Sequence, residues 1–132
     1  ILADASGDMP PERWGRRVVE VYLEHAADRV VYEANFGGAL VATIIRQAAR
    51  AMGVPAPPLR AVHARRGKAL RAEPVAQLYA EGQVWHAQVF ESLEEQMVGW
   101  TPDSADSPDR LDAMVYAVTD LLLGRSRTLA SV

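Results

Sequence analysis

The chain of 132 residues contains no cysteine, which excludes disulfide bonds, thiolate zinc sites and a cysteine nucleophile. Any catalysis must therefore use oxygen or nitrogen groups or a bound metal ion. No apolar run approaches the roughly 20 residues that a transmembrane helix needs. The sequence therefore predicts no membrane-spanning helix and no membrane partner.

Lysine is nearly absent, because Lys68 is the only lysine among 14 basic residues. The formal net charge is −3, which argues against a protein that coats nucleic acid through bulk positive charge. Four basic residues nevertheless gather in one short segment: Arg65, Arg66, Lys68 and Arg71. A polyanion such as DNA could meet this segment, and the alternative is a solvated basic turn.

Several well-known catalytic and nucleotide-binding motifs are missing. The segment around Gly67 and Lys68 lacks the upstream glycine and the following serine or threonine of a phosphate-binding loop. No serine lies in a G-x-S-x-G setting, and the three histidines are isolated from one another. The sequence therefore supports neither a nucleotide-binding loop, nor a serine hydrolase, nor a zinc site.

The composition is that of a folded domain, with 49% hydrophobic and 23% charged residues. Helical spacing of apolar residues predicts helices over residues 10–25, 40–52, 68–81 and 91–99, and a last helix that begins at Pro108 and ends before Gly124. Short β-branched or apolar runs predict strands at residues 29–32 and 59–63, the tail of a strand at 1–3 and a weak strand at 83–86. We expect one domain over residues 1–124 and a tail at 125–132.

Alternation of strands and helices is typical of α/β proteins with right-handed crossovers. We expect a mixed sheet in which the strands at 30–32 and 60–62 are adjacent and parallel. Functional sites in such sheets lie at the carboxyl ends of the strands, where Glu33 is found.

Three acids are the sharpest candidates for chemistry: Glu33 at a strand end, and Asp109 and Asp112 in the first turn of the last helix. Carboxylate oxygens from separate elements are the ligands that Mg²⁺ or Mn²⁺ takes, and two such ions can act on a phosphodiester. The alternative is that acids at a helix start are present only because they interact well with the helix dipole. If the metal interpretation holds, the Glu33 and Asp112 carboxylates should lie about 4 to 8 Å apart.

Five sequence blocks together resemble the nuclease domain of the large terminase subunit of tailed phages and prophages. In order along the chain, they are EANFGG at 33–38, VHARRGKALRAEP at 62–74, GQV at 82–84, LEEQM at 93–97 and SPDRLDA at 107–113. Each block is weak alone, and their order makes the match specific. The resemblance covers residues 1 to about 123.

The resemblance implies a ribonuclease H-like fold and a hydrolase that cuts concatemeric double-stranded DNA with Mg²⁺ or Mn²⁺ during packaging. It implies Glu33 and Asp112 as catalytic metal ligands and Asp109 as a supporting acid. With it, Lys68, Arg71, Arg65 and Arg66 are the expected DNA-binding residues. The implied partners are the terminase ATPase domain, the small terminase subunit and the portal, in the cytoplasm of a bacterial host.

The chain departs from the family pattern at its beginning. The family's first catalytic aspartate lies on the opening strand of a three-stranded meander, and too few residues precede the first helix here to form that meander. Asp4 better matches the third meander strand. We therefore expect a C-terminal part of a longer protein that lacks the first meander strands. The alternative function is a non-catalytic ribonuclease H-like module that docks to DNA or to the packaging motor or portal.

Overall fold

The computed structural model describes residues 1–35, 37–63, 67–101, 104 and 108–124. The chain divides into two compact units, which we treat separately. The α/β unit comprises Ala5–Ala64, and the helical unit comprises Ile1–Asp4 together with Arg65–Val132. The expectation of one nuclease domain over residues 1–124 stays a prediction.

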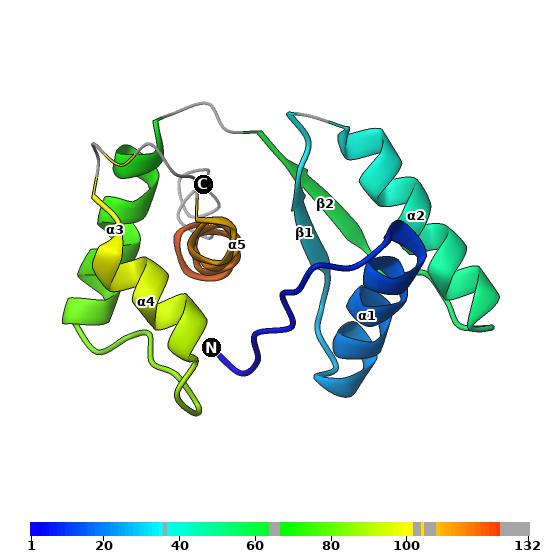
Figure 1. The fold of residues 1–132 in the computed structure, drawn as a ribbon, viewed down its shortest axis with the longest axis horizontal. Helices are drawn as coiled ribbons and strands as arrows, with labels where there is room; N and C mark the ends of the chain where they lie inside the picture. The colour runs from blue at the N-terminus through cyan, green and yellow to red at the C-terminus, as the bar shows by residue number, and fades with distance from the viewer. Residues whose placement is uncertain (36, 64–66, 102–103, 105–107, 125–132) are drawn as a thin grey trace, which may run out of the picture. The chain divides into compact units, whose positions relative to one another are not determined.

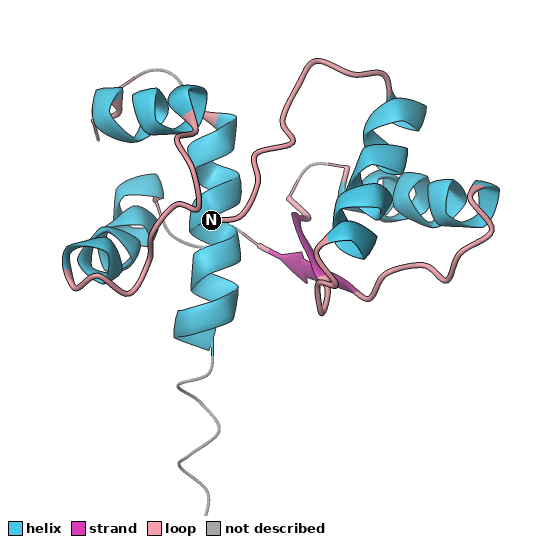
Figure 2. Ribbon diagram, turned by 90° about the horizontal axis from the view of Figure 1, so that it is seen from below, coloured by secondary structure: helices cyan, strands magenta, loops and turns pink. Residues whose placement is uncertain are grey.

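In its described residues the α/β unit contains two strands and two helices, α1 (Pro11–Glu24), β1 (Val30–Glu33), α2 (Gly38–Ala51) and β2 (Leu59–Val62). The two strands pair in parallel, with Val30 opposite Leu59 and Glu33 opposite Val62. Figure 2 shows this pair in magenta. Parallel strands require a crossover connection, which α2 supplies. The adjacent parallel strands and the α/β class were correctly predicted, and the sheet of the described residues consists of this pair.

Close packing of α1 on α2 holds the α/β unit together. Figure 1 shows the two helices side by side. Val19 of α1 and Ile45 and Ala49 of α2 are almost fully buried in the shared core. The helices approach closely at Gly15, where an added Cβ would lie 2.6 Å from Ile44 Cγ2 and 3.3 Å from the Ile44 carbonyl oxygen. The absence of a side chain at Gly15 therefore sets the distance between the helices.

We expect Gly15→Ala to destabilise the α/β unit. Alanine in a helix gains about 1 kcal/mol over glycine, but overpacking of a close helix contact costs about 1 to 3 kcal/mol. Gly99→Ala is the matched control, because nothing lies within 4 Å of a Cβ built on this helical glycine. Urea denaturation followed by circular dichroism measures both changes. A Gly15→Ala variant as stable as Gly99→Ala would contradict the close contact.

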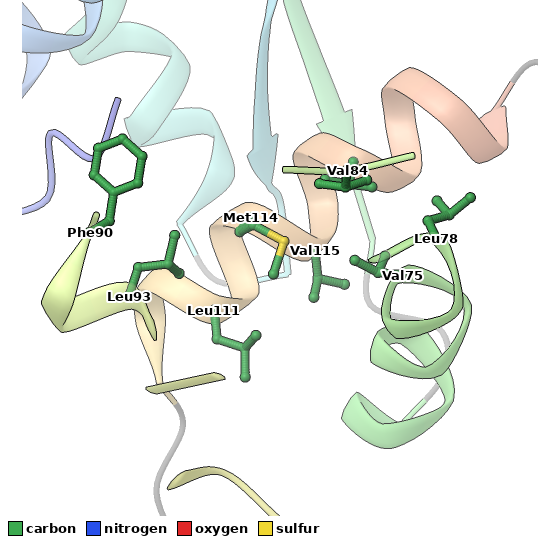
Figure 3. Packing of buried hydrophobic residues seen from close by; sticks show 9 residues of the cluster. Val75, Leu78, Val84, Phe90, Leu93, Leu111, Met114 and Val115 are labelled. Carbon is green, nitrogen blue, oxygen red and sulfur yellow. The ribbon is translucent and has the colours of Figure 1, made fainter. Parts of the chain in front are cut away.

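The helical unit packs three helices around one apolar cluster. They are α3 (Lys68–Ala80), α4 (Glu91–Gly99) and α5 (Asp109–Val118), and a π-helical turn, η1 (Thr119–Leu123), extends α5. Figure 3 shows α5 contributing Leu111, Met114 and Val115 to the cluster, while α3 and α4 supply further apolar side chains. Because α5 lies in the centre of the cluster, packing from both neighbours fixes its first turn.

Two expected strands are not strands, and this corrects the sequence interpretation. Residues 1–3 and 83–86 form no β-ladder. They do meet through one pair of backbone hydrogen bonds, in which the Ile1 nitrogen donates to the Trp85 carbonyl and the Ala87 amide donates to the Ile1 carbonyl. A single pair of bonds does not extend into a strand, because the neighbouring residues make no further ladder bonds with each other.

Other element boundaries differ only slightly from expectation. Proline cannot donate a backbone hydrogen bond and so favours a kink or a restart of a helix, but α3 runs through Pro74 as one helix. Helix α5 begins at Asp109, and Pro108 precedes it in an extended conformation instead of occupying the first helical position. Serine is a favoured N-cap residue, so the sequence also predicts Ser107 as the cap of this helix, and Ser107 lies outside the described residues.

Candidate functional site

Glu33 is placed by a tight connection between β1 and α2. It is the last residue of β1 and is exposed, and the next amide, of Ala34, still donates to the Val62 carbonyl at 2.9 Å. Helix α2 then starts at Gly38, where a Cβ would come within 2.9 Å of the Ala34 Cβ. The glycine permits this close turn. The structure therefore places Glu33 at the carboxyl end of a parallel strand, as the sequence predicted.

Asp109 and Asp112 both lie in the first turn of α5, as predicted, but their surroundings differ. Asp109 is exposed. The Asp112 side chain is only 20% exposed, and its Oδ2 lies 2.8 Å from Nζ of Lys68, which is itself only 19% exposed. Asp112 is therefore already paired with a cation from the first residue of α3.

The second expected DNA-binding residue also faces α5. The Arg71 guanidinium donates a hydrogen bond to the hydroxyl of Tyr116, and its Cζ lies 4.9 Å from the centre of that ring. Lys68 and Arg71 are three residues apart on α3, and Asp112 and Tyr116 are four apart on α5, so the two contacts are about one helical turn apart. We call these two contacts the α3–α5 latch. Arg65 and Arg66 lie outside the described residues.

Helix α5 receives its N-terminal cap from another helix. The Gln96 side-chain oxygen, on α4, accepts the amides of Arg110 and Leu111 at 3.0 and 3.1 Å. These are two of the donors that a helix start leaves without an intrahelical partner. The Asp4 carboxylate accepts from Arg110 Nε at 3.0 Å in the same region. Sequence reasoning missed Gln96 and Tyr116, because neither belongs to a local capping pattern and only tertiary packing brings them to their partners.

The acidic side chains within each unit show whether that unit could bind a divalent metal ion. Carboxylate oxygens are the correct donor type for Mg²⁺ or Mn²⁺. Within the described ranges, however, no three His, Asp or Glu side chains are arranged to hold a metal ion. The described residues of each unit therefore do not by themselves form a site with three such ligands. The predicted distance between the Glu33 and Asp112 carboxylates joins two separately described units, and it stays a prediction.

A separate chain of hydrogen bonds connects α3, the following loop and α4. His86 Nδ1 lies 2.8 Å from Glu94 Oε1, and His86 Nε2 lies 2.8 Å from the Tyr79 hydroxyl. A carboxylate can only accept, so His86 Nδ1 donates the hydrogen bond to Glu94. The bond from His86, followed by the bond from the Phe90 amide, lowers the pKa of Glu94, while burial and then the Glu94 charge raise the pKa of Tyr79. These contacts brace the helical unit.

We expect Glu94→Gln to reduce the acid sensitivity of the fold. A carboxyl group whose folded-state pKa is lowered contributes stability above its ordinary value of 4.5, and this contribution is lost as the pH falls through the folded-state value. The midpoint of thermal unfolding, measured from neutral pH to below pH 4, should therefore fall less steeply in the variant. Glu95→Gln, which changes the adjacent carboxylate outside the His86 hydrogen bond, is the control. Equal acid slopes for wild type and Glu94→Gln would contradict the assignment.

The parallel strands, their helical crossover and the acid at the strand end define an α/β domain. A family model for the terminase RNaseH-like domain matches residues 7–121. The match covers most of the chain, so the chain belongs to this family. The resemblance seen in the five sequence blocks is thereby confirmed, and with it the ribonuclease H-like fold class.

No curated protein and no solved structure gives a significant match to the chain. In the described part of the chain, no helix has an apolar stretch sufficient for a transmembrane span.

Proposed function

We propose that this chain is the nuclease domain of a viral DNA-packaging terminase and takes part in metal-dependent cutting of concatemeric double-stranded DNA. The single observation that carries the proposal is the match to the terminase RNaseH-like family over residues 7–121. In this proposal Glu33 and Asp112 are the catalytic acids and metal ligands, and Asp109 supports them. The ATPase domain, the small subunit and the portal are its partners, in the cytoplasm of the bacterial host.

The basic residues support a DNA partner. Lys68 and Arg71 lie on one face of α3, next to the first two turns of α5, where Asp109 and Asp112 are found. Cations beside candidate acids are the arrangement expected where a phosphate backbone is held and cut. In the proposal Lys68 and Arg71, with Arg65 and Arg66 before them, neutralise phosphates.

The ion pair of Asp112 with Lys68 favours a second function. The Asp112 carboxylate is paired with Lys68, and the described residues of each unit include no group of three acids or histidines placed to hold a metal ion. These two observations favour a ribonuclease H-like module that binds DNA or the packaging motor without cutting. The two functions predict different results in the same assay.

The test is nicking of supercoiled plasmid by the native gene product that contains this chain, with Mn²⁺ or Mg²⁺ and with a chelator. Cutting that needs the metal and is lost in Glu33→Gln supports the nuclease. Glu24→Gln, a change at an exposed acid of α1, is the matched control and should cut normally. A wild-type protein that binds the plasmid but never cuts it supports the docking module.

A further inference from the structure

The α3–α5 latch holds both DNA-binding candidates of α3 that the structure describes. Lys68 Nζ lies 2.8 Å from the Asp112 carboxylate and 6.0 Å from the centre of the Trp100 ring. Arg71 bonds to Tyr116 and stacks over its ring. Both cations thus already have oxygen partners on α5. A DNA phosphate that reached these cations would compete with Asp112 and Tyr116 for them.

We propose that the latch is an autoinhibitory contact that DNA opens: phosphate oxygens replace Asp112 and Tyr116 as the partners of Lys68 and Arg71. This inference rests on the proposed function and adds its regulation. Without DNA, Lys68 neutralises the Asp112 carboxylate. With DNA bound, the Asp112 carboxylate is released at the moment when the phosphate arrives. DNA binding therefore removes the Lys68 contact from this acid.

The chemistry of the four groups favours this exchange. A carboxylate oxygen at 2.8 Å has the charge and the spacing that a phosphate oxygen would have beside Lys68. Tyr116 offers Arg71 only a neutral acceptor, whereas a phosphate offers charged oxygens in a geometry that a guanidinium matches with two hydrogen bonds. Within the described residues, the buried Arg71 Nε has no hydrogen-bond partner. Arg71 therefore gains from a phosphate what Tyr116 does not provide.

The ion pair is open enough to be exchanged. The side chains of Lys68 and Asp112 keep 19% and 20% of their surface exposed. Partly exposed ion pairs are weak, and the energy of such a pair corresponds to at most about a fivefold change in an equilibrium constant. The latch should therefore weaken DNA binding measurably without preventing it.

The first test compares two aspartates in one helical turn. We expect Asp112→Asn in the 132-residue chain to bind a short fluorescent DNA duplex at low salt about fivefold more tightly than Asp109→Asn does. Both variants remove one negative charge from the first turn of α5, and Asp112 is the aspartate that forms the 2.8 Å ion pair with Lys68. In a Lys68→Met background this difference should vanish. Equal affinities of the two single variants, or a difference that persists without Lys68, would overturn the proposal.

A second variant keeps the test valid if Asp112→Asn fails to fold. Tyr116→Phe retains the ring over Arg71 and removes only the accepting hydroxyl. We expect it to bind the duplex about twofold more tightly than wild type, because the hydroxyl that competes with phosphate for Arg71 is then removed. Weaker binding by this variant would contradict the proposed exchange.

The closing experiment follows Lys68 directly by NMR, since the only lysine of the chain gives a single side-chain ammonium signal. We expect the signal of ¹⁵N-lysine-labelled protein to shift in Asp112→Asn, to change little in Asp109→Asn and to shift when the duplex is added. No response to Asp112→Asn would overturn the latch. A response to Asp112→Asn without a response to DNA would overturn opening by DNA. Either failure is distinguishable from failure of the nuclease proposal, which the plasmid assay tests independently.

Discussion

Replacing Asp112 by asparagine in the native gene product should abolish cleavage of supercoiled DNA while leaving DNA binding intact or strengthened. Asparagine has nearly the same size as aspartate and can still accept a hydrogen bond from Lys68 across the 2.8 Å contact. It carries no negative charge, and a neutral amide is a poor substitute for a carboxylate where a divalent cation must be held. The loss should therefore appear in cleavage and not in binding. Plasmid nicking and duplex binding, measured on the same preparation, separate the two effects.

Asp109→Asn is the matched control for this prediction. It removes the same charge from the same helical turn, but Asp109 is exposed and is assigned only a supporting role. We expect it to reduce cleavage less than Asp112→Asn does. If the two variants cut equally well, or if Asp112→Asn cuts like wild type, Asp112 is not a catalytic acid and the docking module becomes the better explanation.

The helices and the parallel pair could be predicted because their signals are local. Helix α4 was predicted at residues 91–99, which are its observed bounds. Strand β1 is a short β-branched and aromatic run that ends before a glycine turn, and β2 follows a proline-rich segment. The segments at 1–3 and 83–86 have similar apolar character but form no ladder. A strand depends on a neighbour with several matching hydrogen bonds, and this property is not encoded in either segment alone.

The candidate site was predictable as a set of residues but not as a set of contacts. The sequence placed Asp112 at a helix start and Lys68 in a basic segment, with separate roles for each. Their ion pair depends on the packing of α3 against α5 around Met114 and Val115. Along the sequence, α3 and α5 are separated by the whole of α4. The same packing brings Arg71 to Tyr116. Contacts between segments far apart in the sequence thus pair Asp112 with Lys68, and no local sequence pattern indicates this pair.

The core of the α/β unit supplies the largest expected effect on stability. Ile45 is 1% exposed and packs in a small buried cluster with Val19 and Ala49. Ile45→Ala removes three carbon atoms from this cluster, and such changes cost about 2 to 5 kcal/mol because the cavity collapses only in part. A unit of this size buries little apolar surface in total, so this is a large share of its stability. The effect should also reach Glu33, because α2 follows β1 directly.

Leu40→Ala on the same helix is the control, because Leu40 is 63% exposed and its truncation should change stability by less than about 0.5 kcal/mol. Native-state amide hydrogen exchange of α1 and α2 measures the stability of the α/β unit directly. We expect much faster exchange in Ile45→Ala and nearly unchanged exchange in Leu40→Ala. If Ile45→Ala exchanged as slowly as wild type, the buried cluster between α1 and α2 would not be what stabilises the α/β unit.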